Sequence, residues 1–263
     1  MVITVGVACS IGVPVDRGGR AHHGDNYLVC EHGRLAWREG TGEHHEKAAG
    51  HGVLVAVADG MGGAAAPVAS TAAMRILSRL YQERAPKDPK RALRRYVLEA
   101  HRRLHRRARV DGPVRMGTTL TTCWLLDDAV SWLQVGDSRL YLQRGGALRQ
   151  LTPEHTLGEF AQRDGQVGRD GHLAQAFIYG SRGLGDDTSL RLEPGRDTGT
   201  EPLEAGDRLV LCTDGLWRWV DDVSLADVLR HTPDPQAAAV ACMERAMARG
   251  STDNITVIVV GVG

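Results

Sequence analysis

The stretch VLVAVADGMGGAAA, residues 53–66, places a carboxylate directly after six apolar residues. An apolar run of this length that ends at glycines is typical of a buried strand. Asp59 would then lie at the tip of that strand. It either begins a tight Asp-Gly turn, which is the commonest use of this dipeptide, or it has a function there. The remainder of the chain has to decide between the two interpretations.

Length and composition are those of an ordinary globular protein. The chain has 263 residues, 42% of them hydrophobic, and 32 basic side chains balance 32 acidic ones. This balance gives no overall attraction to nucleic acid or to a membrane surface. The N-terminus has the pattern of a first strand, and no apolar run reaches membrane-spanning length. We expect a single domain over residues 1–263 that acts as a cytoplasmic monomer.

Apolar and β-branched runs predict most of the strands, and helical spacing predicts three helices. The strands are expected at residues 2–9, 27–30, 53–58, 118–126, 129–135, 139–143, 208–213 and 255–260. The helices are expected at residues 67–82, after Pro89, and at 235–249. The arginines of the second helix indicate a solvated basic face, because only Tyr96 accompanies them as a stacking residue.

The cysteines carry no redox or metal pattern. None of the five belongs to a CxxC pair. Cys9, Cys30, Cys123 and Cys212 lie in apolar, strand-like runs, so we expect small buried side chains in a reducing compartment.

Aspartates recur at the ends of the predicted strands. WLQVGDSR and RLVLCTDGLW end apolar runs with an aspartate, and RAHHGDNYLV and STDNITVIVV place one just before a run. With the opening stretch, this gives five residues, namely Asp25, Asp59, Asp137, Asp214 and Asp253. A turn explains each one alone. Together, three strand ends and two strand starts of a mixed or antiparallel sheet can share one rim.

Five carboxylates at one rim would repel one another and would require positive charge. A pair of hard divalent cations supplies that charge, and an oxygen-only ligand set suits Mg²⁺ or Mn²⁺ rather than zinc. The eleven histidines form no ligand pattern. Neighbours such as His22 and His23 point to opposite faces of an extended chain. The sequence therefore predicts a centre for two hard cations.

The ordered motifs resemble those of the type-2C metal-dependent protein serine/threonine phosphatases. Arg20 and Asp25 match the first motif of that family. The later motifs follow in order as DGMGG (59–63), MGTTL (116–120), VGDSR (135–139), LTPEHTL (151–157), SRGLGDD (181–187), TDGLW (213–217) and TDNITVIVV (252–260). Each motif alone is weak, but the ordered set covers nearly the whole chain and is specific.

The resemblance implies a fold and an activity. The fold would be α+β, a four-layer αββα sandwich of two mainly antiparallel sheets flanked by helices, with a flap at about residues 156–187. The activity would be hydrolysis of phosphoserine and phosphothreonine in proteins, by direct attack of a hydroxide that bridges two Mn²⁺ or Mg²⁺ ions. The partners would be phosphorylated proteins and a cognate Ser/Thr kinase pathway.

The resemblance also implies the ligands of the two ions. Asp59 would bridge both ions, and the Gly60 carbonyl would bind one of them. Asp214 and Asp253 would complete one ion. Asp25 would act at the other, directly or through water.

Two further residues have roles by resemblance. Arg20 would hold the substrate phosphate through its planar, bidentate donors. Asp137 resembles a family aspartate that contacts a third, weaker ion in bacterial members.

The chain differs from the family pattern at three places. His23 and Gly24 replace the Asn-Glu or Asn-Gln that usually precedes the aspartate. Ala64 stands where bacterial relatives usually have histidine, and Arg218 stands where many have aspartate. The first difference removes the usual acidic or amide group beside the metal-bound water. The second concerns the proton donor to the leaving group, which we expect to be missing. The third concerns the third ion. His22 or His23 could replace the donor, although a solvent-exposed pair is the simpler interpretation.

Three functions therefore remain open from the sequence. The favoured one is an active phosphoserine/phosphothreonine protein phosphatase, since all five residues of the two-metal set and Arg20 are intact. The second is a degenerate, weakly active member that serves as a regulatory binding module. The third is a phosphatase for a dedicated anti-sigma-type antagonist protein or for a small phosphate ester.

Overall fold

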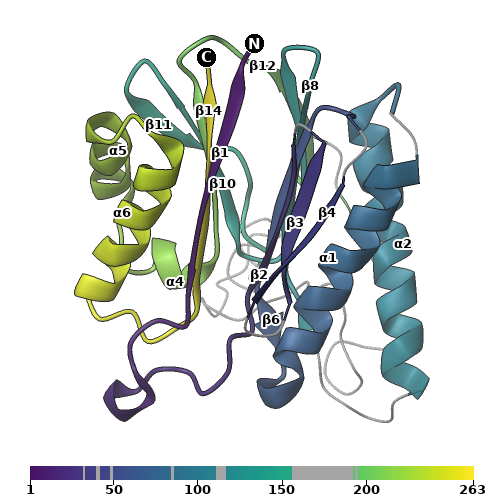
Figure 1. Cartoon of the computed structure of the whole chain (residues 1–263), viewed down its shortest axis with the longest axis vertical. Coiled ribbons are helices and arrows are strands. Elements are labelled where there is room, and N and C mark those ends of the chain that lie inside the picture. Colours follow the sequence, from purple (N-terminus) through teal and green to yellow (C-terminus); the bar gives the residue numbers. More distant parts are fainter. Residues whose placement is uncertain are drawn as a thin grey trace, which may run out of the picture.

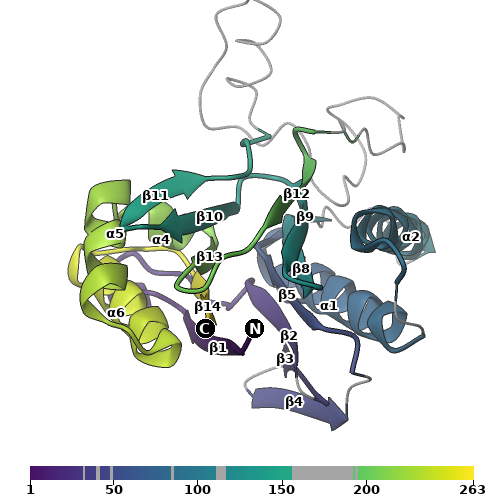
Figure 2. The same ribbon diagram turned by 90° about the horizontal axis from the view of Figure 1, so that it is seen from above.

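The chain folds into two antiparallel sheets that face each other, with helices on both outer faces (Figures 1 and 2). The computed structural model describes residues 1–31, 33–39, 42–47, 50–83, 86–110, 117–155, 192 and 195–263. The arrangement confirms the predicted four-layer αββα sandwich. The predicted flap at about residues 156–187 lies outside the described residues.

The larger sheet has seven strands with β5 at its centre. Its order is β12 (Thr198–Pro202), β9 (Ala129–Val135), β8 (Leu120–Leu126), β5 (Val53–Ala58), β2 (Asn26–Glu31), β3 (Arg34–Glu39) and β4 (Gly42–Lys47). Helices α1 (Ala66–Glu83) and α2 (Pro89–Val110) cover its outer face (Figure 2). A short ladder of β6 (Gly60–Met61) and β7 (Gly117–Thr118) adjoins it.

The smaller sheet has five strands, and three helices cover it. Its order is β1 (Ile3–Ser10), β14 (Ile255–Val262), β13 (Arg208–Cys212), β10 (Arg139–Arg144) and β11 (Ala147–Gln150). The helices are α4 (Asp214–Trp217), α5 (Asp222–His231) and α6 (Pro235–Ala248). They lie on the side away from the larger sheet (Figure 2).

Three layers of apolar side chains separate the four layers of backbone. Successive residues of a strand point to opposite faces, so β5 contributes to two cores. Val55 and Val57 pack between the sheets, whereas Leu54 and Ala56 pack under α1 and α2. Burial on both faces explains why this strand is apolar throughout, as the sequence predicted.

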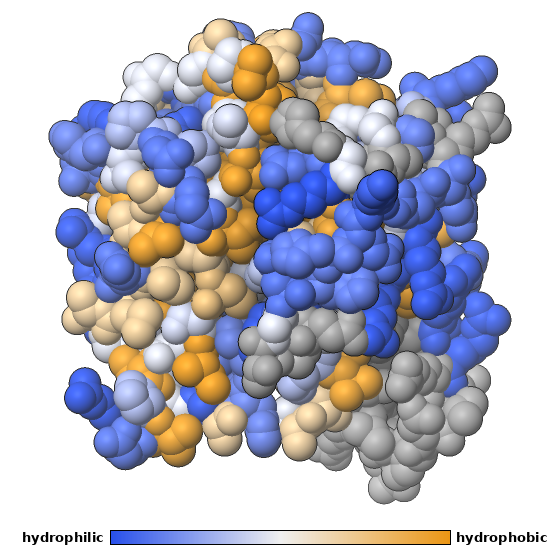
Figure 3. Space-filling view, viewed as in Figure 1, coloured by the Kyte–Doolittle hydropathy of each residue, from blue (hydrophilic) through white to orange (hydrophobic). Residues whose placement is uncertain are grey.

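Several elements were not predicted from the sequence, and one of them, β4, has no apolar side chain. Strand β4 is GEHHEK, and most of its side chains are exposed (Figure 3). Charged side chains on such an edge strand oppose pairing with another molecule. Strands β3, β11 and β12 and helix α5 were also not predicted. The strand expected at residues 118–126 is divided at Thr119, and the one expected at 208–213 ends at Cys212.

The cysteine prediction is correct for three of the four residues. Cys30, Cys123 and Cys212 are buried, but Cys9 is only partly buried. Its Sγ lies 3.3 Å from His23 Nε2, so this thiol contacts a polar neighbour rather than only the core. No helix in the described ranges has the length and apolarity needed to cross a bilayer.

The interface between the two sheets should carry much of the stability. Ile258 of β14 is fully buried there. The substitution Ile258→Ala should lower the free energy of unfolding by about 2–5 kcal/mol, because it removes buried carbons and leaves a cavity. Val223→Ala is the control, since Val223 is 81% exposed. Equal denaturation midpoints for the two variants would contradict the assigned core.

Candidate metal centre

The five aspartates meet at the end of the sandwich opposite the two termini, near β6, α4 and the start of α1 (Figure 1). A cavity of about 510 Å³ opens there. Its lining comes from residues 20–22, Gly24, residues 59–63, Ala66 and residues 253–254, together with Asp137, Asp214 and Arg218. Asp25 is not part of the lining; it is 2% exposed and interacts with Asp214 and Asp253. The predicted rim therefore exists as a spatial cluster.

The MGTTL motif fixes the backbone of Asp59. The Asp59 amide donates to Thr119 Oγ1 at 2.9 Å, and the Thr119 amide donates to the Asp59 carbonyl at 2.9 Å. Thr118 Oγ1 donates to the same carbonyl at 3.0 Å. Three hydrogen bonds thus hold the residue that follows β5, and they leave its carboxylate directed to the cavity.

Glycines allow the loops around the cavity to pack backbone against backbone. A Cβ atom on Gly60 would lie 2.3 Å from the Ala66 carbonyl oxygen and 2.6 Å from that of Gly24. A Cβ atom on Gly215 would lie 2.0 Å from the Asn254 carbonyl oxygen. Any side chain at these two positions would force the aspartate loops apart.

Polar side chains of the last two motifs hold Asp25 and its neighbours. Thr213 Oγ1 donates to Asp25 Oδ2 at 2.7 Å and accepts from the Thr256 amide at 3.0 Å. Asn254 Oδ1 accepts from the Gly24 amide at 2.6 Å. The first motif is therefore joined to the start of β14, although about 230 residues separate them in the sequence.

A buried histidine fixes the loop that carries Asp137. His155 Nδ1 accepts from the Gly136 amide at 3.1 Å, and the His155 amide donates to the Gly136 carbonyl at 2.8 Å. Because Nδ1 is an acceptor, Nε2 carries the proton and donates to Asp197 Oδ1 at 2.9 Å. His155 belongs to the motif LTPEHTL, but the motif did not indicate this role, and nothing in the sequence singled out Asp197.

Burial and mutual repulsion raise the pKa values of the clustered carboxyl groups. Burial is the larger cause and the neighbouring aspartates add to it. The pKa of Asp25 rises to about 7 and that of Asp137 to about 7. The pKa values of Asp59 and Asp214 are also raised. Without added positive charge, the cluster therefore retains protons that isolated aspartates would lose.

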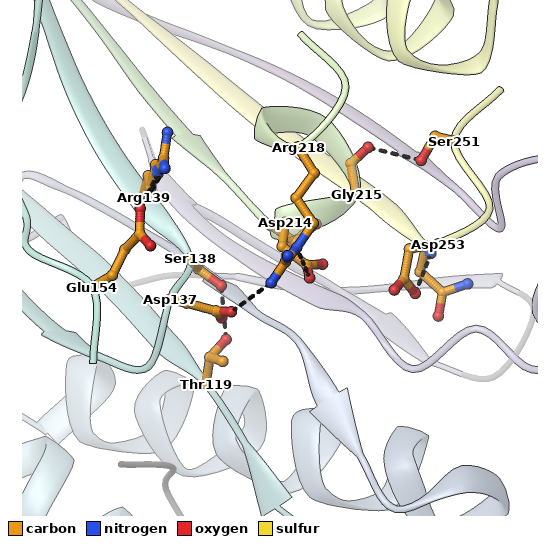
Figure 4. Close-up of polar contacts among 12 residues, drawn as sticks. Thr119, Asp137, Ser138, Arg139, Glu154, Asp214, Gly215, Arg218, Ser251 and Asp253 are labelled. Carbon is orange, nitrogen blue, oxygen red and sulfur yellow. Dashed lines mark hydrogen bonds and ion pairs between the residues drawn. The ribbon is translucent and has the colours of Figure 1, made fainter. Parts of the chain in front are cut away.

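Two arginines supply part of that charge. Arg20 donates to Asp253 through Nε at 2.7 Å and through Nη2 at 2.5 Å, and this pair raises the pKa of Arg20. Arg218 donates to Asp214 Oδ2 at 2.8 Å, and its Nη2 lies 3.7 Å from Asp137 Oδ2 (Figure 4). Both guanidinium groups line the cavity.

The carboxylate cluster suits hard divalent cations. Asp137 Oδ1 and Asp214 Oδ1 are buried and have no hydrogen-bond partner within the described part of the chain. Buried, unpartnered carboxylate oxygens are the ligands that Mg²⁺ and Mn²⁺ prefer. As the side chains stand, with arginines beside them, no three acidic, histidine or cysteine residues of the described ranges surround one point.

The two adjacent histidines have different surroundings, as their alternation predicted. His22 is exposed and lines the cavity. His23 instead turns toward Cys9, and burial, with Arg38 nearby, lowers its pKa to about 4. His22 is therefore the imidazole that could meet a substrate.

The raised pKa values predict how the metal-free protein responds to pH. In the folded state Asp25 and Asp137 retain protons to about pH 7, whereas in the unfolded chain they lose them near pH 3.8. Between these values the folded state binds more protons, so the free energy of unfolding should fall as pH rises. His23, whose pKa is lowered from 6.5 to about 4, acts in the opposite sense between these two values and offsets part of the fall, whereas Asp221, whose pKa is lowered to about 2, does so only at more acidic pH.

The measurement is thermal unfolding in chelator at about pH 5 and about pH 8. We expect the lower Tm at the higher pH. The double variant Asp25→Asn with Asp137→Asn is the control, and it should reduce that slope. A Tm that increases from the lower to the higher pH would contradict the prediction.

Comparison with known proteins identifies the family. Residues 42–250 match the model of the family described as protein phosphatase 2C. The serine/threonine phosphatase Stp of Listeria welshimeri is 32% identical over 216 residues, which cover 79% of this chain and 83% of that protein. The serine/threonine protein phosphatase PstP of Mycobacterium tuberculosis is 31% identical over 214 residues, which cover 80% of this chain and 40% of that protein.

A solved structure agrees with these relatives. The catalytic domain of PstP, in complex with two manganese ions, superposes with a TM-score of 0.75 and 26% identity over 99% of both chains. The chain therefore belongs to the protein phosphatase 2C family and is a serine/threonine protein phosphatase.

Proposed function

We propose that this phosphatase hydrolyses phosphoserine and phosphothreonine in proteins with two Mn²⁺ or Mg²⁺ ions at the aspartate cavity. The observation that carries the proposal is the convergence of five buried or half-buried carboxylates in and beneath one cavity, where a buried Asp214 oxygen has no hydrogen-bond partner within the described residues. The two manganese ions in the PstP structure support it.

The ligands would be those that the family resemblance implies. Asp59 would contact both ions and the Gly60 carbonyl one of them, while Asp214 and Asp253 would complete one ion. Asp25 lies beneath the cavity, which suits a role at the other ion, directly or through water. When bound, such ions supply a water nucleophile of lowered pKa and positive charge for the phosphoryl oxygens.

Arg20 is suited to hold the phosphate of the substrate. Its side chain is 60% exposed and already forms two hydrogen bonds to one carboxylate, that of Asp253. A phosphate group presents a similar pair of oxygens to the planar donors of a guanidinium. The Arg20 guanidinium can therefore release the Asp253 carboxylate and bind the substrate phosphate with the same pair of donors.

The substrates and the assembly state follow from the same proposal. The substrates would be phosphorylated proteins, so a Ser/Thr kinase must act before this enzyme in a shared pathway. We infer a monomer, because the large exposed apolar side chains of the described residues are scattered. They are Met1, Val2, Ile11, Val15, Val68 and Val223.

The metal assignment is tested by Asp59→Asn. Removal of even an outer-shell group typically costs about 10–100-fold, so loss of the shared ligand should lower kcat by at least about a hundredfold. The metal-free variant should unfold no more easily than the wild type, because a buried carboxylate with a raised pKa has been removed. Rates are measured on an aryl phosphate and on a phosphopeptide with Mn²⁺ in excess.

The matched control is Asp227→Asn on α5, where the side chain is 52% exposed. It should retain wild-type rates. Wild-type turnover in Asp59→Asn would refute the assignment. A wild-type protein inactive on both substrates would instead support the regulatory binding module.

The proton donor to the leaving group determines which substrates react well. Ala64, where relatives usually have histidine, lies in the 3-10 turn Gly63–Ala65, and its neighbour Gly63 lines the cavity. A general acid contributes about 10²- to 10⁴-fold, and mostly for a poor leaving group such as a seryl alkoxide. We expect the enzyme to be relatively better on aryl phosphates than on phosphoserine peptides. Ala64→His should improve peptide turnover by at least about tenfold and aryl phosphate turnover less.

The competing donor is His22, which lines the cavity. His22→Ala should leave both rates nearly unchanged. His23→Ala is its control, since His23 faces Cys9. A large loss in His22→Ala alone, confined to phosphopeptides, would show that this chain has a proton donor after all.

A further inference from the structure

Arg218 lies at the edge of the metal centre, and its guanidinium is held in place from two sides. It follows α4 directly, so the helical turn returns its Nε to Asp214 Oδ2 at 2.8 Å. Its Cζ lies 4.7 Å from the centre of the Trp217 ring, and Arg139 Cζ lies 3.8 Å from the same ring. Arg139 is in turn bonded to Glu154. Stacking on a fixed indole limits where the Arg218 charge can go.

The guanidinium lies between two carboxylates that come from different parts of the chain (Figure 4). Asp214 begins α4, whereas Asp137 lies in the turn between β9 and β10 and is 4% exposed. Arg218 Nη2 is 3.7 Å from Asp137 Oδ2. Within the described residues, Arg218 forms ion pairs with both carboxylates, those of Asp137 and Asp214.

We propose that Arg218 is the permanent cation of this site, in place of a third metal ion between Asp137 and Asp214. The inference rests on the proposed two-metal function. It assigns Asp137 to Arg218 rather than to an ion, and so it departs from the role that the family resemblance implies for this aspartate. Arg218 is a positioning residue, since it would act on the reaction through Asp214.

The physical reason is the fixed charge of arginine. A guanidinium does not lose its proton in a protein, so it cannot yield the site to a metal ion by deprotonation. Two like unit charges about 4 Å apart near a protein surface repel enough to weaken binding by roughly a thousandfold. A divalent ion beside Arg218 would experience at least this repulsion.

The test is the number of Mn²⁺ ions bound per chain, measured by equilibrium dialysis and by electron paramagnetic resonance. Arg218→Gln removes the charge and keeps a side chain that can reach Asp214. Arg218→Asp introduces the acidic residue that many relatives have at this position. If Arg218→Asp does not fold, Arg218→Gln alone provides the test. Arg149→Ala is the matched control, because Arg149 pairs with Glu201 on the exposed surface.

The wild type and Arg149→Ala should bind two ions even in a large excess of Mn²⁺. At least one Arg218 variant should bind a third ion, at least about a hundredfold more tightly than the wild type, and Asp137→Asn added to it should abolish that ion. A wild type that binds three ions and loses one in Asp137→Asn would overturn the proposal, as would Arg218 variants that still bind two. Fewer than two ions in every protein would refute the two-metal function itself.

Kinetics distinguish this role from direct contact with the substrate. Arg20→Ala removes the proposed phosphate contact and should raise KM by about ten- to a hundredfold. If Arg218 is a positioning residue, Arg218→Gln should change kcat and the Mn²⁺ stoichiometry more than KM. A rise in KM equal to that of Arg20→Ala, with the stoichiometry still two, would show that Arg218 binds phosphate and would overturn the proposal.

Discussion

Repulsion among buried carboxylates is the constraint on which this structure depends. Asp25 and Asp137 are almost fully withdrawn from water, Asp59 between the loops is partly buried, and their raised pKa values express the cost of that arrangement. A cluster of this kind persists only where the surrounding fold determines its geometry. Three continuous apolar cores between four layers provide such a scaffold, because the strands that carry the aspartates are buried on both faces.

The scaffold converts that constraint into a binding site through short polar contacts. Threonines at three strand ends hold the backbone or carboxylate of an aspartate, namely Thr118 and Thr119 for Asp59 and Thr213 for Asp25. Glycines let the loops touch backbone to backbone, so the carboxylates of both sheets reach one cavity. The two arginines differ in their attachment. Arg20 pairs with Asp253 alone, whereas Arg218 stacks on Trp217 and lies beside both Asp137 and Asp214.

The sequence predicted those parts of the fold whose burial is visible in a local pattern. Strands such as β5 and β14 are mostly apolar, and the five aspartates follow or precede such runs, so these strands and the rim could be expected, whereas the sandwich was implied by the family resemblance. Strand β4 could not, because its charged, exposed residues resemble a loop. The contact of His155 with Asp197 spans 42 residues, and that of Arg218 with Asp137 joins two separate loops. Neither contact leaves a pattern in the local sequence, because both depend on how the two sheets pack together.

We propose that the carboxylates hold two divalent ions around Asp59. A crystal structure of the protein soaked in Mn²⁺, with anomalous differences recorded at the manganese absorption edge, would locate these ions. We expect two anomalous peaks in the cavity, both in contact with Asp59, and none between Asp137 and Asp214. Crystals soaked to saturation that show no peak beside Asp59, or that show a single ion elsewhere in the cavity, would contradict the two-ion proposal.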